Sequence, residues 1–296
     1  MPNLRSDAVS SAPSSHGARI ALLTVVAMLA FAGNSLLCRL ALKGTQIDAA
    51  SFTLVRIASA ALVLGVILLA RGGDRPSARR AGSWRSALAL IVYAIAFSFA
   101  YVRLAAGAGA LLLFGAVQAT MIGYGIATGE RLAVVQWLGL LLALAGLVWL
   151  ALPGLAAPEP LSSALMIVAG VGWGVYSLRG RGQTDPVAAT AGNFLRALPF
   201  AVAVSALAFT TARFDRAGVV YAAASGALTS GLGYVVWYAA LKGLKPAVAA
   251  TVQLSVPVIT AAGGVLLLGE ALTARLAASS VAILGGIALV VLSKRH

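Results

Sequence analysis

Residues 129–132 read Gly-Glu-Arg-Leu, and residues 269–272, which begin 140 positions later, read Gly-Glu-Ala-Leu. Glutamate occurs only three times in the 296 residues, at positions 130, 159 and 270, so two of the three fall at one spacing. The same spacing superposes Arg56 on Arg196. Because Arg and Glu are rare in this chain, these matches carry weight that Gly or Leu matches would not. The spacing predicts an internal duplication.

The composition indicates that the solvent around most of the chain is lipid. Hydrophobic residues make up 60% of the sequence and charged residues 10%, and the mean hydropathy is +0.96. A soluble domain carries about 25% charged residues, enough to cover its surface. The apolar runs are continuous and do not alternate with polar residues, which excludes the pattern of a transmembrane β-barrel.

The apolar runs are long enough for helices that cross about 30 Å of hydrocarbon, which takes roughly 20 residues each. The sequence predicts an all-α integral membrane protein with ten transmembrane helices. We place them near 18–42, 49–70, 86–105, 107–127, 131–152, 161–180, 187–209, 217–239, 246–268 and 272–292. The first run is too long for a signal peptide, which favours an uncleaved first span.

The duplication divides the chain into four parts. We expect a disordered cytoplasmic tail over 1–17, a first five-helix repeat over 18–152, a linker over 153–160 and a second repeat over 161–293. Five spans is an odd number, so the second repeat must enter the membrane in the opposite direction. Transporters built this way place the substrate in a central cavity between the repeats.

The distribution of Lys and Arg predicts the orientation. With an inside N-terminus, fourteen of these residues fall in cytoplasmic segments and six in outer segments. Cytoplasmic loops carry the excess of Lys and Arg, so both termini are predicted to be cytoplasmic. The net charge of +14 is spread over these short gaps and forms no patch, which argues against nucleic-acid binding.

Several site classes are excluded by composition. Cys38 is the only cysteine, and His16 and His296 are both terminal, so disulfides, metal sites and His-based catalysis are not expected. No Asp or Glu lies inside a predicted span. A proton-coupled exporter of lipophilic cations needs such a carboxylate, so its absence favours a neutral or zwitterionic solute. Facilitated transport and proton coupling both stay open.

The charged residues of the repeat have two interpretations each. Glu130 and Glu270 are predicted to begin the last helix of each half, where the helix dipole favours a carboxylate; coupling or gating is the alternative. Arg56 and Arg196 lie inside their spans, where a charge needs a partner or water. Pairing with helix-end carbonyls, or snorkelling, is preferred, and an anion contact with a substrate carboxylate is the alternative.

The candidate substrate site consists of neutral polar and aromatic residues inside the spans, which an apolar cavity would need to bind a zwitterion. These are Asn34, Tyr93, Tyr101, Gln118, Trp173, Tyr176, Trp237, Tyr238 and Gln253. We expect Trp173 to stack on an aromatic ring, and Asn34 and Gln253 to bind amino and carboxylate groups. Tyr101, Trp237 and Tyr238 lie near span ends, so they could instead be interfacial anchors.

A five-span unit that ends in Gly129–Leu132 or Gly269–Leu272 resembles the drug/metabolite transporter superfamily, in particular proteins with two tandem EamA-type domains. Pro257 also matches that pattern, whereas the first repeat has Val117 at the equivalent place. The resemblance extends from about residue 18 to residue 293 and is greatest to bacterial exporters of aromatic amino acids. It implies a ten-helix basket around a central cavity, with no cofactor and no ATPase domain.

The predicted function is export of small solutes, amino acids that are aromatic or otherwise neutral, across the bacterial inner membrane by alternating access. A nucleotide-sugar transporter remains an alternative, because Lys43, Arg56 and Arg196 could meet phosphates. A passive channel and a membrane-embedded enzyme are the alternatives from other classes; the enzyme would need an acid or histidine cluster that the sequence lacks. The oligomeric state stays open, with a monomer among the possibilities.

Overall fold

The computed structural model describes residues 15–71, 81–129, 132–152, 157–180, 183–244, 252–253 and 255–293. Within these ranges every regular element is helical and no strand occurs, which confirms the all-α prediction. The predicted tail up to residue 14, half of the predicted linker (153–156), and Glu130 lie outside the described residues.

The helices follow the predicted apolar runs. Those of the first half are α1 (Ser15–Gly44), α2 (Ala49–Ala70), α4 (Trp84–Tyr101), α5 (Ala106–Ala127) and α6 (Val134–Ala151). Those of the second half are α7 (Pro160–Gly180), α8 (Pro186–Leu207), α9 (Arg216–Ala224), α10 (Gly233–Leu241), α12 (Ser255–Leu268) and α13 (Ala274–Leu292). The π-helix η2 (Ser225–Leu232) joins α9 to α10, and a short 3₁₀ turn, η1 (Phe209–Thr211), follows α8.

Seven helices of the described parts are long and apolar enough to span a membrane. They are Gly17–Gly44, Ala49–Ala70, Trp84–Tyr101, Ala106–Ala127, Pro160–Gly180, Pro186–Leu207 and Arg216–Leu241. Three further apolar helices, Val134–Leu150, Ser255–Leu268 and Ala274–Leu289, are shorter. The sequence predicts full spans at these three places as well, so the structure supports seven of the ten by length and composition.

Local hydrogen bonds explain where some helices depart from the predicted bounds. The first helix begins at Ser15, three residues inside the predicted tail. The chain turns after Tyr101 because the amides of Arg103 and Leu104 both donate to the carbonyl of Ala100. The last helix begins only at Ala274, since the Thr273 side chain accepts from the amide of Leu276 and caps it.

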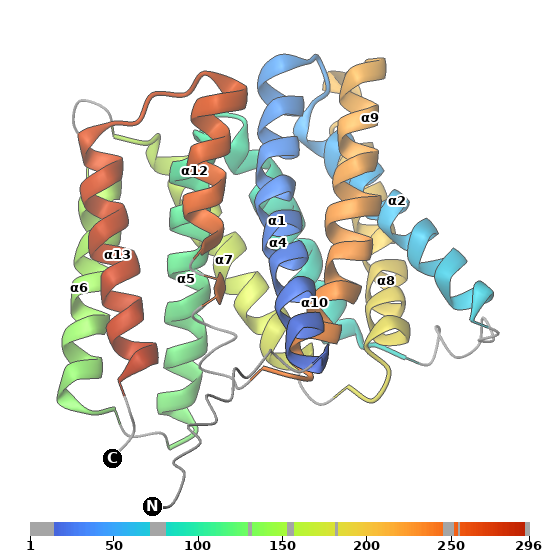
Figure 1. The fold of residues 1–296 in the computed structure, drawn as a ribbon. Helices are drawn as coiled ribbons and strands as arrows, with labels where there is room; N and C mark the ends of the chain where they lie inside the picture. Colours follow the sequence, from blue (N-terminus) through green and yellow to red (C-terminus); the bar gives the residue numbers. More distant parts are fainter. Residues whose placement is uncertain are drawn as a thin grey trace, which may run out of the picture.

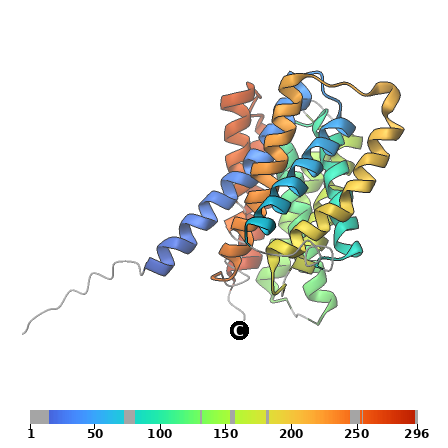
Figure 2. The same ribbon diagram turned by 90° about the vertical axis from the view of Figure 1, so that its right-hand side faces the viewer.

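Successive spans run in opposite directions, with α9, η2 and α10 together forming one span, so the first turn of α1 and the last turn of α13 lie at the same end of the bundle (Figure 1). Helices α6 and α13 pack together on one side, and α2 and α8 pack together on the other. Between them, α4 and α5 both pack on α7, while α10 and α12 both pack on α1. Figure 2 shows the first turns of α1 standing away from the other helices.

The outer surface is apolar. Leu22, Leu62, Leu138, Leu207 and Leu266 each expose more than half of their area, and similar side chains occur on the outward faces of most helices. An apolar surface this extensive is unstable in water but stable in lipid. The inward faces are rich in Ala and Gly, and small residues let membrane helices approach closely.

Two loops at one end of the bundle bind each other reciprocally. Asp48 caps α2 and also accepts a 2.9 Å hydrogen bond from the amide of Arg213, before α9. Asp215 caps α9 and accepts a 3.2 Å hydrogen bond from the amide of Gln46, before α2. Each carboxylate satisfies the start of its own helix and fixes the opposite loop, so the two halves of the chain are joined at this end.

Candidate functional site

A narrow cavity lies where α1, α4, α5, α7 and α10 meet. We call it the central cavity. It is lined by Phe31, Asn34, Ser35, Tyr93, Phe97, Leu113, Phe114, Trp173 and Tyr234. The space inside has room for roughly one water molecule. Six of the nine lining side chains are aromatic, so the cavity is mainly an apolar, ring-lined space with a short polar wall.

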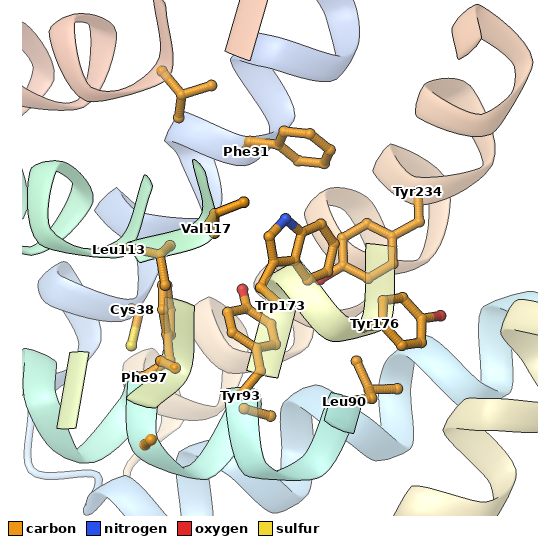
Figure 3. Packing of buried hydrophobic residues seen from close by; sticks show 14 of the residues in the cluster. Phe31, Cys38, Leu90, Tyr93, Phe97, Leu113, Val117, Trp173, Tyr176 and Tyr234 are labelled. Atoms are coloured by element: carbon orange, nitrogen blue, oxygen red, sulfur yellow. The ribbon is translucent and has the colours of Figure 1, made fainter. Parts of the chain in front are cut away.

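Trp173 occupies the middle of the aromatic cluster. Its ring centroid lies 4.7 Å from that of Tyr234, 5.0 Å from that of Tyr93 and 5.9 Å from that of Phe31. Figure 3 shows the indole between these three rings, with the Tyr93 hydroxyl directed in among them. The tilted and edge-on contacts are the geometries that aromatic pairs prefer, and another planar ring could join them.

The polar wall is centred on Asn34 and Tyr93. Nδ2 of Asn34 donates to the Tyr93 hydroxyl at 3.0 Å. Oδ1 of Asn34 accepts from Ser225 Oγ at 2.8 Å and from Thr229 Oγ1 at 3.3 Å. Both hydroxyl donors belong to the π-helix η2, which therefore fixes the orientation of the amide.

Arg56 lies directly behind this wall. Its side chain is 1% exposed, yet no carboxylate pairs with it: among the described residues, the one salt bridge joins Arg39 to Glu270. Nη2 of Arg56 donates to the Tyr93 hydroxyl at 2.9 Å, and Nε donates to Ser230 Oγ at 3.2 Å. The guanidinium also lies over the rings of Tyr93 and Phe97, at 5.1 and 4.9 Å from their centroids. Nη1 has no hydrogen-bond partner among the described residues.

Arg196, which follows Arg56 by 140 positions, is placed differently. Its Nη1 donates to the carbonyls of Ala81 at 2.7 Å and Gly192 at 2.9 Å, and its guanidinium lies over Trp84. This is the carbonyl pairing that the sequence favours for both arginines. Only Arg196 has it, so the preferred interpretation is wrong for Arg56, whose hydrogen bonds go to side-chain hydroxyls of the cavity wall.

Three of the nine predicted site residues line the central cavity: Asn34, Tyr93 and Trp173. Tyr176 is buried one layer behind, with its ring 5.6 Å from that of Trp173. Trp237 packs edge-on against Phe31, with 5.7 Å between the ring centroids. These two residues support the lining rings from outside the cavity.

The other four lie elsewhere. Tyr101 is buried, stacks edge-on against Phe97 and donates to the carbonyl of Ala106 at 3.3 Å, which makes it a packing residue. Tyr238 lies close to Gly180 at the end of α7, where a Cβ atom would meet the tyrosine hydroxyl. Gln253 is buried but is not among the residues that line the cavity.

Gln118 lines a second, smaller cavity between α5, α6 and α13. Its neighbours there are Gly115, Ala119, Ile122, Leu140, Ala143, Leu144 and Ile287. The side chain is 2% exposed, and its Nε2 has no hydrogen-bond partner among the described residues. Apart from Gln118, every residue that lines this cavity is apolar, so it offers little to recognise a polar substrate.

Sequence reasoning missed most of the apolar lining and the cation behind it. Phe31, Phe97 and Tyr234 were not among the predicted site residues, and the role of Arg56 was left open. Tyr234 follows Tyr93 by 141 positions, one more than the repeat spacing, so the repeat alignment does not pair these two tyrosines and gave no signal for Tyr234.

Glu270 does not begin the last helix, contrary to the sequence prediction. It lies in the loop before α13, and its Oε2 accepts from the amide of Ala106 at 2.7 Å, so it caps the start of α5. Its Oε1 accepts from Arg39 Nε at 3.0 Å. Gly269 has φ +62° and Gly129 has φ +97°, a left-handed conformation that favours glycine and turns the chain out of the preceding helix.

The sequence model of the EamA-like transporter family matches residues 161–292, which comprise α7 to α13. A protein of Pseudomonas aeruginosa, described as "Uncharacterized protein PA1977", is 57% identical over 272 residues, which cover 92% of this chain and 94% of the relative. The chain belongs to the EamA-like transporter family. It is therefore a multi-pass membrane transporter that acts on a small molecule, and members of the family are typically not enzymes.

A solved structure, described as "Crystal structure of protein", has the same fold, with a TM-score of 0.65. The two chains are 18% identical, and the match covers 92% of this EamA-like chain and 97% of the other. In the described parts of this transporter, no group of three or more His, Cys, Asp or Glu residues could hold a metal ion.

Proposed function

We propose that this EamA-like transporter exports small solutes with an aromatic or apolar body, in particular aromatic and other neutral amino acids. The observation that carries the proposal is the central cavity, in which Trp173, Tyr93, Tyr234, Phe31 and Phe97 surround a short polar wall. Ring-lined space with a few oriented polar groups is the usual form of a site for a small amphipathic ligand. The resemblance of the repeat motif to exporters of aromatic amino acids points the same way.

The proposed architecture is two inverted five-helix repeats, 18–152 and 161–293, that together provide ten membrane spans. The helix contacts support it. Three helices pack on their own counterparts in the other half: α2 on α8, α5 on α12 and α6 on α13. The contacts of α7 and α1 also match, since α7 packs on α4 and α5 as α1 packs on α10 and α12. A two-fold relation between the halves predicts this pattern.

The small size of the central cavity supports the proposed alternating access. Room for roughly one water molecule is too little for an amino acid, so binding requires the surrounding helices to separate. One end of the bundle is held by polar ties: Arg39, from α1, binds Glu270 and the carbonyls of Tyr101 and Val102. We propose that this end opens when these ties break, while the opposite end opens in the other state of the cycle.

We further propose that the protein lies in the bacterial inner membrane with both termini in the cytoplasm. The described cations at the end of the bundle that holds the start of α1 include Arg19, Arg71, Arg85, Arg179 and Lys242. The other nine Lys and Arg predicted for that side lie outside the described residues. The excess of Lys and Arg in those segments supports the assignment.

Nucleotide-sugar transport receives less support from the site. Of the three basic residues that could meet phosphates, Lys43 binds the carbonyl of Leu268 at an exposed end, and Arg196 binds the carbonyl of Ala81 near the start of α4. Only Arg56 adjoins the central cavity. A diphosphate with its two negative charges would have one cation there.

Purified protein in liposomes tests the proposal. Labelled phenylalanine, tryptophan and threonine should each enter by saturable uptake, and unlabelled solute trapped inside should accelerate entry. Counterflow distinguishes a transporter from a passive channel. Failure of all three amino acids together with movement of a nucleotide sugar would show that the proposed substrate class is wrong. Protein-free liposomes and liposomes with an unrelated membrane protein serve as controls.

A further inference from the structure

At Tyr93 and Asn34 the hydrogen bonds of the polar wall leave only donors for a ligand, whereas the hydroxyls of Tyr234 and Ser35 on the same cavity can donate or accept. The Tyr93 hydroxyl oxygen accepts from Nη2 of Arg56 and from Nδ2 of Asn34. A phenol oxygen has capacity for about two such bonds, so the hydroxyl must donate its own proton. Tyr93 lines the central cavity, and its hydroxyl points in among the rings (Figure 3).

Tyr234 and Asn34 extend this donor set. The hydroxyl of Tyr234, on the same cavity, is buried and lacks a well-formed hydrogen bond. If Tyr93 donates to it, the proton of Tyr234 becomes the free donor, so a hydroxyl donor reaches the cavity by either route. Asn34 uses its oxygen on Ser225 and Thr229 and one of its two N–H groups on Tyr93. Its second N–H is also a donor.

Arg56, the cation behind the polar wall, also favours a ligand with a negative group. Arg56 is fully buried, no Asp or Glu of the described residues pairs with it, and its Nη1 has no partner there. A buried cation without a counter-ion is costly, and a negative group nearby lowers that cost. The guanidinium also occupies a face of Tyr93 and a face of Phe97, which a cationic ligand would otherwise use.

We propose that the central cavity recognises a monocarboxylate with an aromatic or apolar body, and that the carboxylate binds the donor wall of Tyr93, Tyr234 and Asn34. Arg56 is a positioning residue: it orients the Tyr93 hydroxyl as a donor and supplies positive potential without lining the cavity. An ammonium group is not required for binding, so an aromatic carboxylic acid without an amino group is also a ligand. The inference rests on the proposed function only in taking the central cavity as the substrate site.

Four ligands with one phenyl ring test the carboxylate preference on the unmodified protein in detergent. They are phenylalanine, phenylalaninamide, 3-phenylpropanoate and the neutral 3-phenylpropanamide. We expect 3-phenylpropanoate to bind about 10- to 100-fold more tightly than 3-phenylpropanamide, the range given by a charge-assisted hydrogen bond. Phenylalanine should exceed phenylalaninamide by a similar factor. Calorimetry or ligand-induced thermal shift measures both ratios.

The outcomes separate this inference from the proposed function. Binding of phenylalanine and of 3-phenylpropanoate, each in preference to its amide, supports the inference and the proposed function. Binding of 3-phenylpropanoate but not phenylalanine supports the inference and removes the amino-acid proposal. Equal binding of phenylalanine and phenylalaninamide overturns the inference and leaves the proposal standing. Preferential binding of the cationic phenylalaninamide, as in an aromatic cage for cations, overturns the inference, and binding of none of the four ligands overturns both the inference and the proposed function.

Variants assign the preference to Arg56 and Tyr93. Arg56→Gln and Tyr93→Phe should each lower the ratio of acid to amide affinity at least about 3-fold, since each removes one part of the anion-binding wall and leaves the others. The matched control is Arg196→Gln, which removes the arginine 140 positions away and should keep the unmodified ratio. A ratio measured within one protein does not change when part of a sample is unfolded, so it distinguishes positioning from stability. A full ratio in both Arg56→Gln and Tyr93→Phe would show that the carboxylate binds elsewhere.

Discussion

Nε of Arg39 lies 3.0 Å from Oε1 of Glu270, and this ion pair joins residues 231 positions apart in the chain. The two side chains are 12% and 9% exposed. The other carboxylate oxygen of Glu270 caps α5, and the guanidinium of Arg39 also binds the last carbonyls of α4. One carboxylate therefore holds α1, α4, α5 and the loop before α13 together.

Removal of this carboxylate should loosen that end of the bundle. We expect Glu270→Gln to lower the free energy of unfolding by about 2 kcal/mol, because it leaves a largely buried guanidinium and a helix start with a weaker acceptor. Thermal unfolding in detergent measures the change. Lys43→Gln, which affects an exposed cation that binds the carbonyl of Leu268, is the control and should shift stability by less than about 0.5 kcal/mol. Equal effects of the two variants would show that the ion pair adds no stability.

Trp173 should determine affinity for aromatic solutes. Trp173→Phe keeps a ring but loses part of the contact with Tyr93 and Tyr234, so we expect KM for labelled phenylalanine to rise roughly 3- to 10-fold, in line with the energy of one aromatic pair. The maximal rate should change less. Trp137→Phe, on the exposed face of α6, is the matched control. An unchanged KM in Trp173→Phe would place the substrate away from the aromatic cluster.

Gln118 should not affect transport. Its amide nitrogen is buried without a partner in the described part of the chain, in a cavity otherwise lined by apolar residues. Replacement by Leu removes an unsatisfied polar group, and we expect a gain in stability of about 1 kcal/mol with uptake unchanged. Loss of uptake in Gln118→Leu, at normal protein level, would return this residue to the substrate path.

Gly226 should be among the least tolerant positions. A Cβ atom there would collide with the side chain of Ser59 and the backbone of Arg56, and backbone cannot move aside cheaply. We expect Gly226→Ala to destabilise the protein by about 3 kcal/mol. Gly285 on α13 has open space beside it, so Gly285→Ala should change stability by no more than about 1 kcal/mol. Similar unfolding temperatures for the two variants would contradict the packing of η2 on α2.

The proposed topology predicts which reporter proteins are active when they are fused to a given position of the chain. A fluorescent protein that folds only in the cytoplasm should be active when fused after residue 296, and a periplasmic phosphatase should be inactive there. The phosphatase should become active when fused after Lys43, in the segment predicted to lie outside. The reverse pattern would invert the orientation of the chain in the membrane.

The sequence predicted the helix positions well because apolar length alone determines them, as for α2, which lies at 49–70 in both prediction and structure. It predicted the site only in part. Asn34, Tyr93 and Trp173 stand out as polar or aromatic residues in the middle of spans, and they line the cavity. Phe31 does not stand out, since a phenylalanine in an apolar run has the same sequence signature whether it faces lipid or a cavity.

The rotation of each helix about its own axis was the missing information. A helix that is apolar all round gives no periodic signal for the face that turns inward. Tyr101 and Gln118 therefore looked like Tyr93 in the sequence, although they face other parts of the bundle. The different surroundings of Arg56 and Arg196 were hidden for the same reason, since the repeat aligns their positions and not their neighbours.

The π-helix η2 converts a repeated sequence into an asymmetric binding site. Residues 85–92, which precede η2 by the repeat spacing of 140, lie within the regular helix α4. In η2 the hydroxyls of Ser225 and Thr229 bind Asn34, and that of Ser230 binds Arg56. Two copies of one design thus become a site with a distinct front and back where a single helix changes its winding.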